Sequence, residues 1–139
     1  MRLRAVLWDN DGVLVDSEAL YLQATREQLG QAGIALPRET FIELSLRKGL
    51  SCFLLAEQAG LSPERVLALR LARDQRYAQL LRAGVPVRPG IEPCLEALHG
   101  RVRMAVVTSS SPDHFELIHA RTSLRVAGHN RVGRSAARE

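Results

Sequence analysis

The stretch WDNDGVLVDSE, residues 8–18, constrains this chain more than any other feature. It places four carboxylates between an apolar run, LRAVLW (3–8), and a segment with helical character. Like-charged side chains that crowd one turn destabilise each other unless a cation, protonation or water relieves the repulsion. Whatever relieves this cluster is therefore the best guide to what the chain does.

Two apolar runs predict two buried strands, and the sequence between them is mostly helical. The strands are expected over 3–8 and over RVRMAVV, residues 101–107. Helices are expected over 18–32, from Pro37, over 51–59, from Pro63 to about Arg82, and over 91–98 after a Pro- and Gly-rich linker at 83–90. If the strands pair in parallel, Asp9 and Thr108 lie side by side at one edge of an α/β sheet, where such folds bind ligands.

Charge, hydropathy and cysteine content exclude several classes of protein. Residues 125–139 carry +3 of the net charge of +4, so the rest of the chain is nearly neutral and no nucleic-acid partner is indicated. No apolar run approaches the ~20 residues that span a bilayer, and no secretory pattern follows the N-terminus. We therefore expect a cytoplasmic protein without a membrane partner, and leave its oligomeric state open. Cys52 and Cys94 are expected to be buried free thiols.

Three interpretations of the acid cluster compete. An EF-hand calcium loop would use Asp9, Asp11 and Glu18, but its first ligand position holds a leucine and a strand-like run precedes it. Turn and helix-cap roles suit Asp16 or Ser17, yet leave two acids uncompensated directly after a buried strand. Phosphoryl transfer fits best, because one carboxylate can attack phosphorus while a second protonates the leaving oxygen, and Mg²⁺ can neutralise the anions.

These residues resemble the haloacid dehalogenase superfamily. WDNDGVLVDSE closely resembles its first motif, D-x-D-G-x-L-x-D-S/T-E, and MAVVTSSS resembles its second motif, an apolar strand that ends in Thr or Ser. The helical stretch after the first motif looks like the cap of the β-phosphoglucomutase and phosphoglycolate phosphatase branch, and VPVRPGIEPCLEALHG resembles its return segment. The resemblance implies an incomplete Rossmann-like α/β core with a parallel sheet and an inserted helical cap. Its parts would be core 1–16, cap 17–84, core 85–124 and a disordered tail, 125–139.

The resemblance also implies roles for individual residues. Asp9 would be the nucleophile and Asp11 the general acid and base, while Gly12 allows the sharp turn between them and the helix. Thr108 and the backbone of Ser109 would hold the phosphate group. The Asp9 side chain and the Asp11 main-chain carbonyl would bind Mg²⁺. A helix cap is the alternative role for the serines, and helix N-termini also attract anions.

The lysine content departs from the family pattern. Lys48, the single lysine, lies where related caps carry a substrate-contacting loop, although a solvated surface lysine explains it equally well. No lysine follows Thr108, so the third motif is not recognisable. The later acids Asp113, Glu116 and Glu139 do not form the fourth motif that completes the magnesium site.

We therefore expect a truncated chain with a marginal fold and impaired activity. Its function would be that of a Mg²⁺-dependent phosphatase that acts on a small phosphorylated metabolite through an aspartyl-phosphate. A noncatalytic remnant that binds Mg²⁺ or phosphate weakly is the first alternative, and a β-phosphoglucomutase-type phosphomutase is the second.

Overall fold

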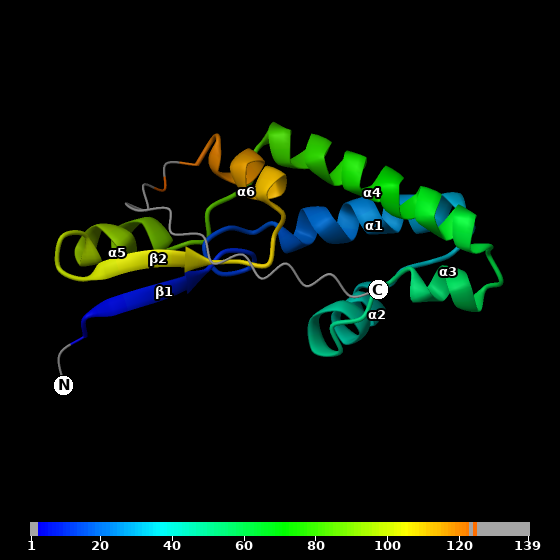
Figure 1. Ribbon diagram of the computed structural model, residues 1–139, viewed down its shortest axis with the longest axis horizontal. Helices are drawn as coiled ribbons and strands as arrows, with labels where there is room; N and C mark the ends of the chain where they lie inside the picture. The colour runs from blue at the N-terminus through cyan, green and yellow to red at the C-terminus, as the bar shows by residue number, and fades with distance from the viewer. Residues whose placement is uncertain (1–2, 123, 125–139) are drawn as a thin grey trace. The chain divides into compact units, whose positions relative to one another are not determined.

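The computed structural model describes residues 3–122 and 124, and the described residues form a mixed α/β structure (Figure 1). The elements, in chain order, are β1 (Ala5–Asp9), α1 (Glu18–Gln31), α2 (Arg38–Phe41), the π-helix η1 (Ile42–Arg47), α3 (Leu54–Gln58), α4 (Pro63–Ala83), α5 (Ile91–Leu98), β2 (Arg103–Val107) and α6 (Pro112–His119). The α/β class is thereby confirmed. The tail expected over 125–139 lies outside the described residues.

The described residues divide into two compact units. The sheet unit runs to Glu18 and resumes at Leu81, and it contains both strands with α5 and α6. The helical unit, Ala19–Leu80, contains α2, η1 and α3 with most of α1 and α4. Domain boundaries after residues 16 and 84 stay a prediction. No helix in the described part of the chain is both long and apolar enough to cross a membrane.

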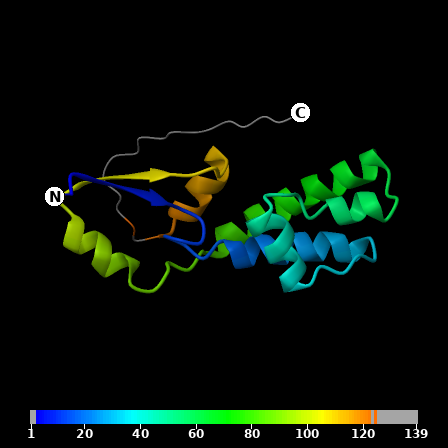
Figure 2. The same cartoon turned by 90° about the horizontal axis from the view of Figure 1, so that it is seen from below.

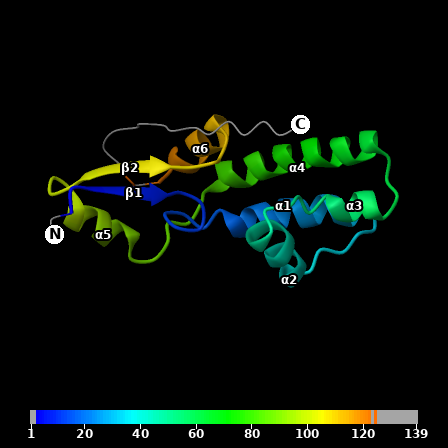
Figure 3. The same ribbon diagram turned by 60° about the horizontal axis from the view of Figure 1, so that its bottom comes forward.

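The two strands pair in parallel and end at the same edge of the sheet (Figures 2 and 3). The register runs from Ala5 opposite Arg103 to Asp9 opposite Val107. Because successive side chains point to opposite faces, Trp8 is half-buried whereas Leu7 is 71% exposed. The loops that follow β1 and β2 therefore begin next to each other, as predicted.

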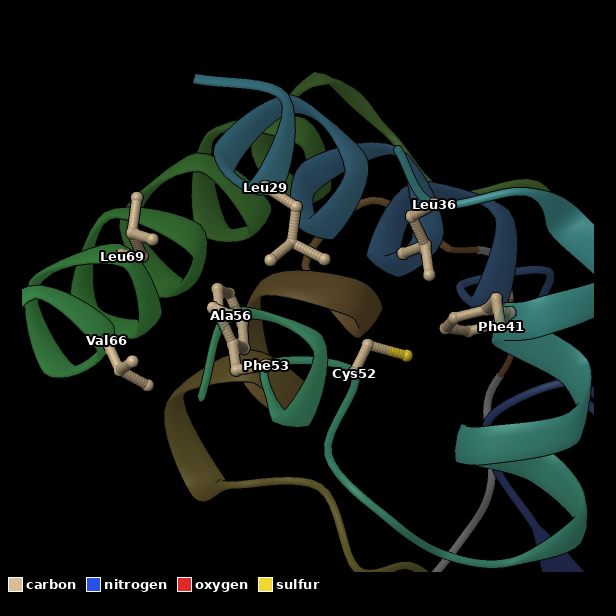
Figure 4. Close-up of a cluster of buried hydrophobic side chains, with 8 residues drawn as sticks. All are labelled: Leu29, Leu36, Phe41, Cys52, Phe53, Ala56, Val66 and Leu69. Carbon is tan, nitrogen blue, oxygen red and sulfur yellow. The ribbon is translucent and has the colours of Figure 1, made fainter. Parts of the chain in front are cut away.

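The helical unit has its own hydrophobic core, which Figure 4 shows. The α1 helix matches its predicted span to within one residue at its end and buries Leu29. The Arg73 guanidinium lies 4.6 Å from the Tyr21 ring centroid and 5.4 Å from that of Phe53, and it donates a hydrogen bond to the Tyr21 hydroxyl. Burial raises the pKa of Tyr21, and the Arg73 charge opposes that shift. The buried members of the core are Leu29, Leu36, Phe41, Cys52, Phe53, Ala56, Val66 and Leu69.

Two helices begin at serine caps. Ser62 Oγ accepts a hydrogen bond of 3.3 Å from the Arg65 N–H, and Pro63 is the first residue of α4. Ser111 Oγ likewise accepts one of 3.3 Å from the His114 N–H at the start of α6. Both arrangements satisfy N–H groups that have no partner within the helix. The predicted starts of α4 and α5 are confirmed.

Two expectations about local structure are wrong, and one feature was not anticipated. The helix expected over 51–59 begins only at Leu54, because Ser51 Oγ accepts from the Phe53 N–H at 3.2 Å and the chain first makes a turn. Residues 42–47 form a π-helix, in which the Lys48 N–H reaches back five residues to the Glu43 carbonyl. Cys52 is a buried free thiol as expected, but Cys94 is exposed, since its neighbour in α5 takes the buried position.

Candidate active site

Asp9 ends β1 with an exposed side chain, and the following residue holds its carboxylate. The Asn10 backbone N–H donates to Asp9 Oδ1 at 2.8 Å. The Asn10 carbonyl accepts from the backbone N–H groups of residues 13–15, at 3.3, 2.9 and 3.2 Å. These main-chain bonds fix the turn directly after the strand, so the first acid faces solvent from a supported position.

Asp11 is surrounded by hydroxyl groups from two distant parts of the sequence. Ser17 Oγ donates to Asp11 Oδ1 at 2.5 Å, and Ser110 Oγ donates to Oδ2 at 2.5 Å. Thr108 Oγ1 donates more weakly to Oδ2 at 3.4 Å and accepts the Ser110 N–H at 3.1 Å. Hydrogen bonds to an ionised carboxylate are stronger than those between neutral groups. These hydroxyls relieve the charge of Asp11, and they join the loop after β1 to the loop after β2.

Gly12 makes the turn between the acids and α1 possible. Its φ of +76° lies in the left-handed region that side-chain-bearing residues rarely adopt. A Cβ at this position would lie 2.8 Å from Glu18 Oε1, closer than a nonbonded contact allows. The Glu18 carboxylate in turn lies in the first turn of α1, where the helix dipole favours an anion.

The segment that follows α4 forms main-chain hydrogen bonds to the turn that carries the acids. The Asp16 N–H donates to the Pro86 carbonyl at 2.8 Å, and the Arg88 N–H donates to the Leu14 carbonyl at 3.0 Å. The Arg88 guanidinium lies 3.9 Å from Asp16 Oδ2, and both side chains are about half exposed. The four acids of the cluster therefore have separate environments, and only Asp9 and Asp11 share the sheet edge.

The roles of two predicted substrate-binding residues, Ser109 and Lys48, stay predictions. Ser109 is exposed between Thr108 and Ser110, and the phosphate role of its backbone stays a prediction. Lys48 belongs to the helical unit, where its Nζ lies 3.2 Å from Glu43 Oε1. Hydrogen bonds from Lys48 and Arg47 hold the pKa of Glu43 below its usual value. Contact between Lys48 and substrate likewise stays a prediction.

The donor set beside the sheet edge fits Mg²⁺ in part. Both carboxylate oxygens of Asp11 accept hydroxyl hydrogen bonds, so the Asp9 carboxylate and the Asp11 main-chain carbonyl are the oxygen donors left for a cation. Within residues 3–122 and 124, no three His, Cys, Asp or Glu side chains are grouped so that they could hold a metal. A cation here would keep several waters, as Mg²⁺ commonly does. The EF-hand interpretation fails, because a strand enters the loop.

Sequence reasoning missed two of the three hydroxyls on Asp11. Ser17 was expected only as a turn or cap residue, and Ser110 only as part of a stretch that could cap a helix. The position of Ser110 could have indicated this contact. Ser110 stands two residues after Thr108, so its hydroxyl can reach the same Asp11 carboxylate. Ser17 carried no comparable signal, because its partner depends on how residues 11–16 turn back on themselves.

A family model supports the interpretation of the motifs. The model for haloacid dehalogenase-like hydrolases matches residues 3–132. Protein CbbY from Cereibacter sphaeroides is 28% identical over 124 residues, which cover 84% of this chain and 54% of that protein. Protein CbbY from Rhodobacter capsulatus is 25% identical over 136 residues, which cover 92% of this chain and 60% of that protein. The chain thus spans between half and two thirds of the length of these relatives.

Solved structures agree with the fold. CbbY from Rhodobacter sphaeroides, in complex with xylulose-(1,5)bisphosphate, is 25% identical with a TM-score of 0.63, over 84% of this chain and 55% of that one. A predicted phosphoglycolate phosphatase from Haemophilus somnus has a TM-score of 0.66 at 19% identity, over 82% of this chain and 55% of that one. At that identity the second likeness concerns the fold alone. Both confirm an α/β core with a parallel sheet.

Proposed function

The chain belongs to the haloacid dehalogenase-like hydrolase family, and from this premise we propose that it is a Mg²⁺-dependent phosphatase that acts on a small phosphorylated metabolite. One observation carries the proposal. Asp9 and Asp11 leave the carboxyl end of β1 where Thr108 and Ser110, from the end of the parallel strand β2, bind the Asp11 carboxylate. Two acids and a hydroxyl-rich loop at one sheet edge are the groups that phosphoryl transfer through a carboxylate requires.

The mechanism needs two steps. In the first, a carboxylate oxygen of Asp9 attacks phosphorus, the bond from phosphorus to the leaving oxygen breaks, and Asp11 gives that oxygen a proton. Asp11 must be protonated at this step, and the serine hydroxyls that donate to its ionised form can accept from its protonated form. In the second, Asp11 takes a proton from a water molecule as the water oxygen attacks phosphorus. The bond between phosphorus and Asp9 then breaks, which releases phosphate and restores the Asp9 carboxylate.

The neighbours of the two acids position them for these steps. The Asn10 N–H occupies Asp9 Oδ1, which leaves Oδ2 to attack. Ser17 and Ser110 fix the plane of the Asp11 carboxyl group. The start of α6, next to Thr108 and Ser109, offers N–H groups and a favourable dipole to a phosphate. When bound to the Asp9 carboxylate and the Asp11 carbonyl, Mg²⁺ supplies positive charge that lets an anionic substrate approach two acids.

The direct test is phosphate release by the purified 139-residue chain. Substrates would be a panel of sugar phosphates, because a related protein binds xylulose-(1,5)bisphosphate, together with phosphoglycolate and an aryl phosphate. We expect release with Mg²⁺ and none after chelation with EDTA. Conversion of a sugar phosphate without released phosphate would instead indicate a phosphomutase. Failure to release phosphate from any compound would contradict the phosphatase.

One observation favours a second candidate function, noncatalytic binding of phosphate or Mg²⁺. Both carboxylate oxygens of Asp11 already accept hydroxyl hydrogen bonds, which leaves two protein oxygens beside the acid pair for a cation. A cation held by two protein oxygens would bind weakly. Titration with inorganic phosphate, followed by ³¹P NMR, would then show binding in a chain that releases no phosphate from any substrate.

Ser110→Ala is expected to lower kcat by about ten- to a hundredfold, because a hydrogen bond to a charged group is worth roughly 1.5–3 kcal/mol. The matched control is Ser111→Ala, which removes a neighbouring hydroxyl that caps α6 and does not bind Asp11. This control should reduce stability by about 1 kcal/mol and leave kcat within a few-fold of wild type. Equal kcat values in the two variants would show that the Ser110 hydroxyl does not orient the acid.

A further inference from the structure

Asn10, which stands between the two acids, forms hydrogen bonds through its N–H, its carbonyl and its side chain. Its side chain is fully buried. Its N–H binds the Asp9 carboxylate and its carbonyl binds three N–H groups of the turn. Its side-chain Oδ1 lies 2.7 Å from His119 Nε2. One residue therefore connects the first acid, the turn that carries the second acid, and the last residue of α6.

The His119 ring is itself held in place. It ends α6, and its centroid lies 4.4 Å from that of Phe115, one helical turn earlier. Its Nδ1 lies 3.0 Å from Thr122 Oγ1. Contacts to both nitrogens and to the ring face leave the imidazole little freedom, so it can serve as a fixed support for a neighbouring group.

The chemistry of the pair predicts one tautomer. An amide oxygen only accepts hydrogen bonds, so Nε2 must carry the proton that lies between His119 and Asn10. In the neutral ring Nδ1 is then an acceptor, and the Thr122 hydroxyl donates to it at 3.0 Å in preference to the His119 carbonyl, which lies 3.5 Å away. Among the described residues, Asn10 Nδ2 has no partner. Reversing the amide would instead leave Oδ1 buried without a donor and require the proton on Nδ1, so the tautomer distinguishes the two arrangements.

We propose that His119 is a positioning residue for the nucleophile. Its Nε2–H holds the buried Asn10 side chain, and Asn10 in turn holds Asp9 through its own N–H. Without this support, the Asn10 side chain loses its anchor, and its N–H can shift relative to the Asp9 carboxylate although the Asn10 carbonyl stays bonded to the turn. A misplacement of about 1 Å in a reacting group can cost about a hundredfold in rate. The effect on turnover rests on the proposed phosphatase function, whereas the positioning itself does not.

The first test is spectroscopic and needs no turnover. Long-range ¹H–¹⁵N NMR spectra of the full chain should show His119 as the Nε2–H tautomer. The Asn10 backbone amide should exchange slowly in wild type and in His119→Gln, whose side-chain amide can still donate to Asn10 Oδ1. In His119→Leu that amide should exchange at least tenfold faster. His99→Leu, which removes an exposed histidine, should leave it unchanged.

The second test is kinetic. His119→Leu should lower kcat by tenfold or more with KM unchanged, and His119→Gln should recover most of the loss. An Nδ1–H tautomer in wild type, or an Asn10 amide that exchanges equally in His119→Gln and His119→Leu, would overturn the proposal even if the chain is an active phosphatase. Absence of turnover in wild type would overturn the proposed function alone. If His119→Leu does not fold, an Nδ1–H tautomer measured in wild type would still overturn the proposal.

Discussion

Replacing Asp9 with asparagine (Asp9→Asn) is expected to reduce phosphate release to the background of the buffer. Asparagine has nearly the same shape as aspartate, and its side-chain oxygen can still accept the Asn10 N–H that now binds Asp9 Oδ1. The turn should therefore keep its conformation. A neutral amide cannot attack phosphorus as a carboxylate does, so the route through an acyl phosphate is lost. Release of phosphate from a sugar phosphate in the presence of Mg²⁺ measures the effect.

The matched control is Asp16→Asn, which neutralises another acid of the same motif. Asp16 contacts the return segment and Arg88 rather than the sheet edge, so this variant should retain most of the wild-type rate. Borohydride added during turnover should reduce the acyl phosphate of the wild-type chain and convert residue 9 to homoserine, which mass spectrometry detects. Wild-type activity in Asp9→Asn would eliminate the aspartyl-phosphate mechanism, and so would the absence of homoserine at residue 9 after borohydride treatment of the wild-type chain.

Features that depend on neighbouring residues could be predicted from the sequence. The helix predicted over 18–32 matches α1 to within one residue, and Pro63 correctly placed the start of α4. The two apolar runs left the pairing direction open, and the family resemblance implied that it is parallel, as the structure shows. That arrangement was enough to bring Asp9 and Thr108 to one edge, which the register and the contact between Thr108 and Asp11 bear out.

Features that depend on distant residues could not be predicted. The hydrogen bonds from Ser17 and Ser110 to Asp11 depend on the course of the turn, and the pairing of Asn10 with His119 joins residues 109 positions apart. Apolar spacing likewise does not distinguish an α-helix from a π-helix over six residues, so η1 was missed. Cys94 was expected to be buried because its neighbours are apolar, whereas only one face of the short helix α5 is covered.

Phe53→Ala is expected to destabilise the helical unit by about 3–5 kcal/mol, the usual cost of removing a buried aromatic side chain. Phe53 is fully buried among the core residues shown in Figure 4. Its ring also lies under the guanidinium groups of Arg73 and Arg70, at 5.4 and 5.9 Å from the ring centroid. The substitution thus creates a cavity and also removes the aromatic face on which two cations rest.

Urea denaturation of the full chain, followed by circular dichroism of the helices, measures this loss. Since domains are typically stable by about 5–15 kcal/mol, the variant should unfold at a much lower urea concentration or be partly unfolded without urea. Leu67→Ala is the control, because Leu67 is 57% exposed on α4 and its removal should change stability by about 0.5 kcal/mol or less. Equal midpoints for the two variants would mean that Phe53 is not part of a packed core. Preserved stability in Phe53→Leu, which keeps most of the volume but no aromatic ring, would assign the loss to the cavity rather than to the two arginines.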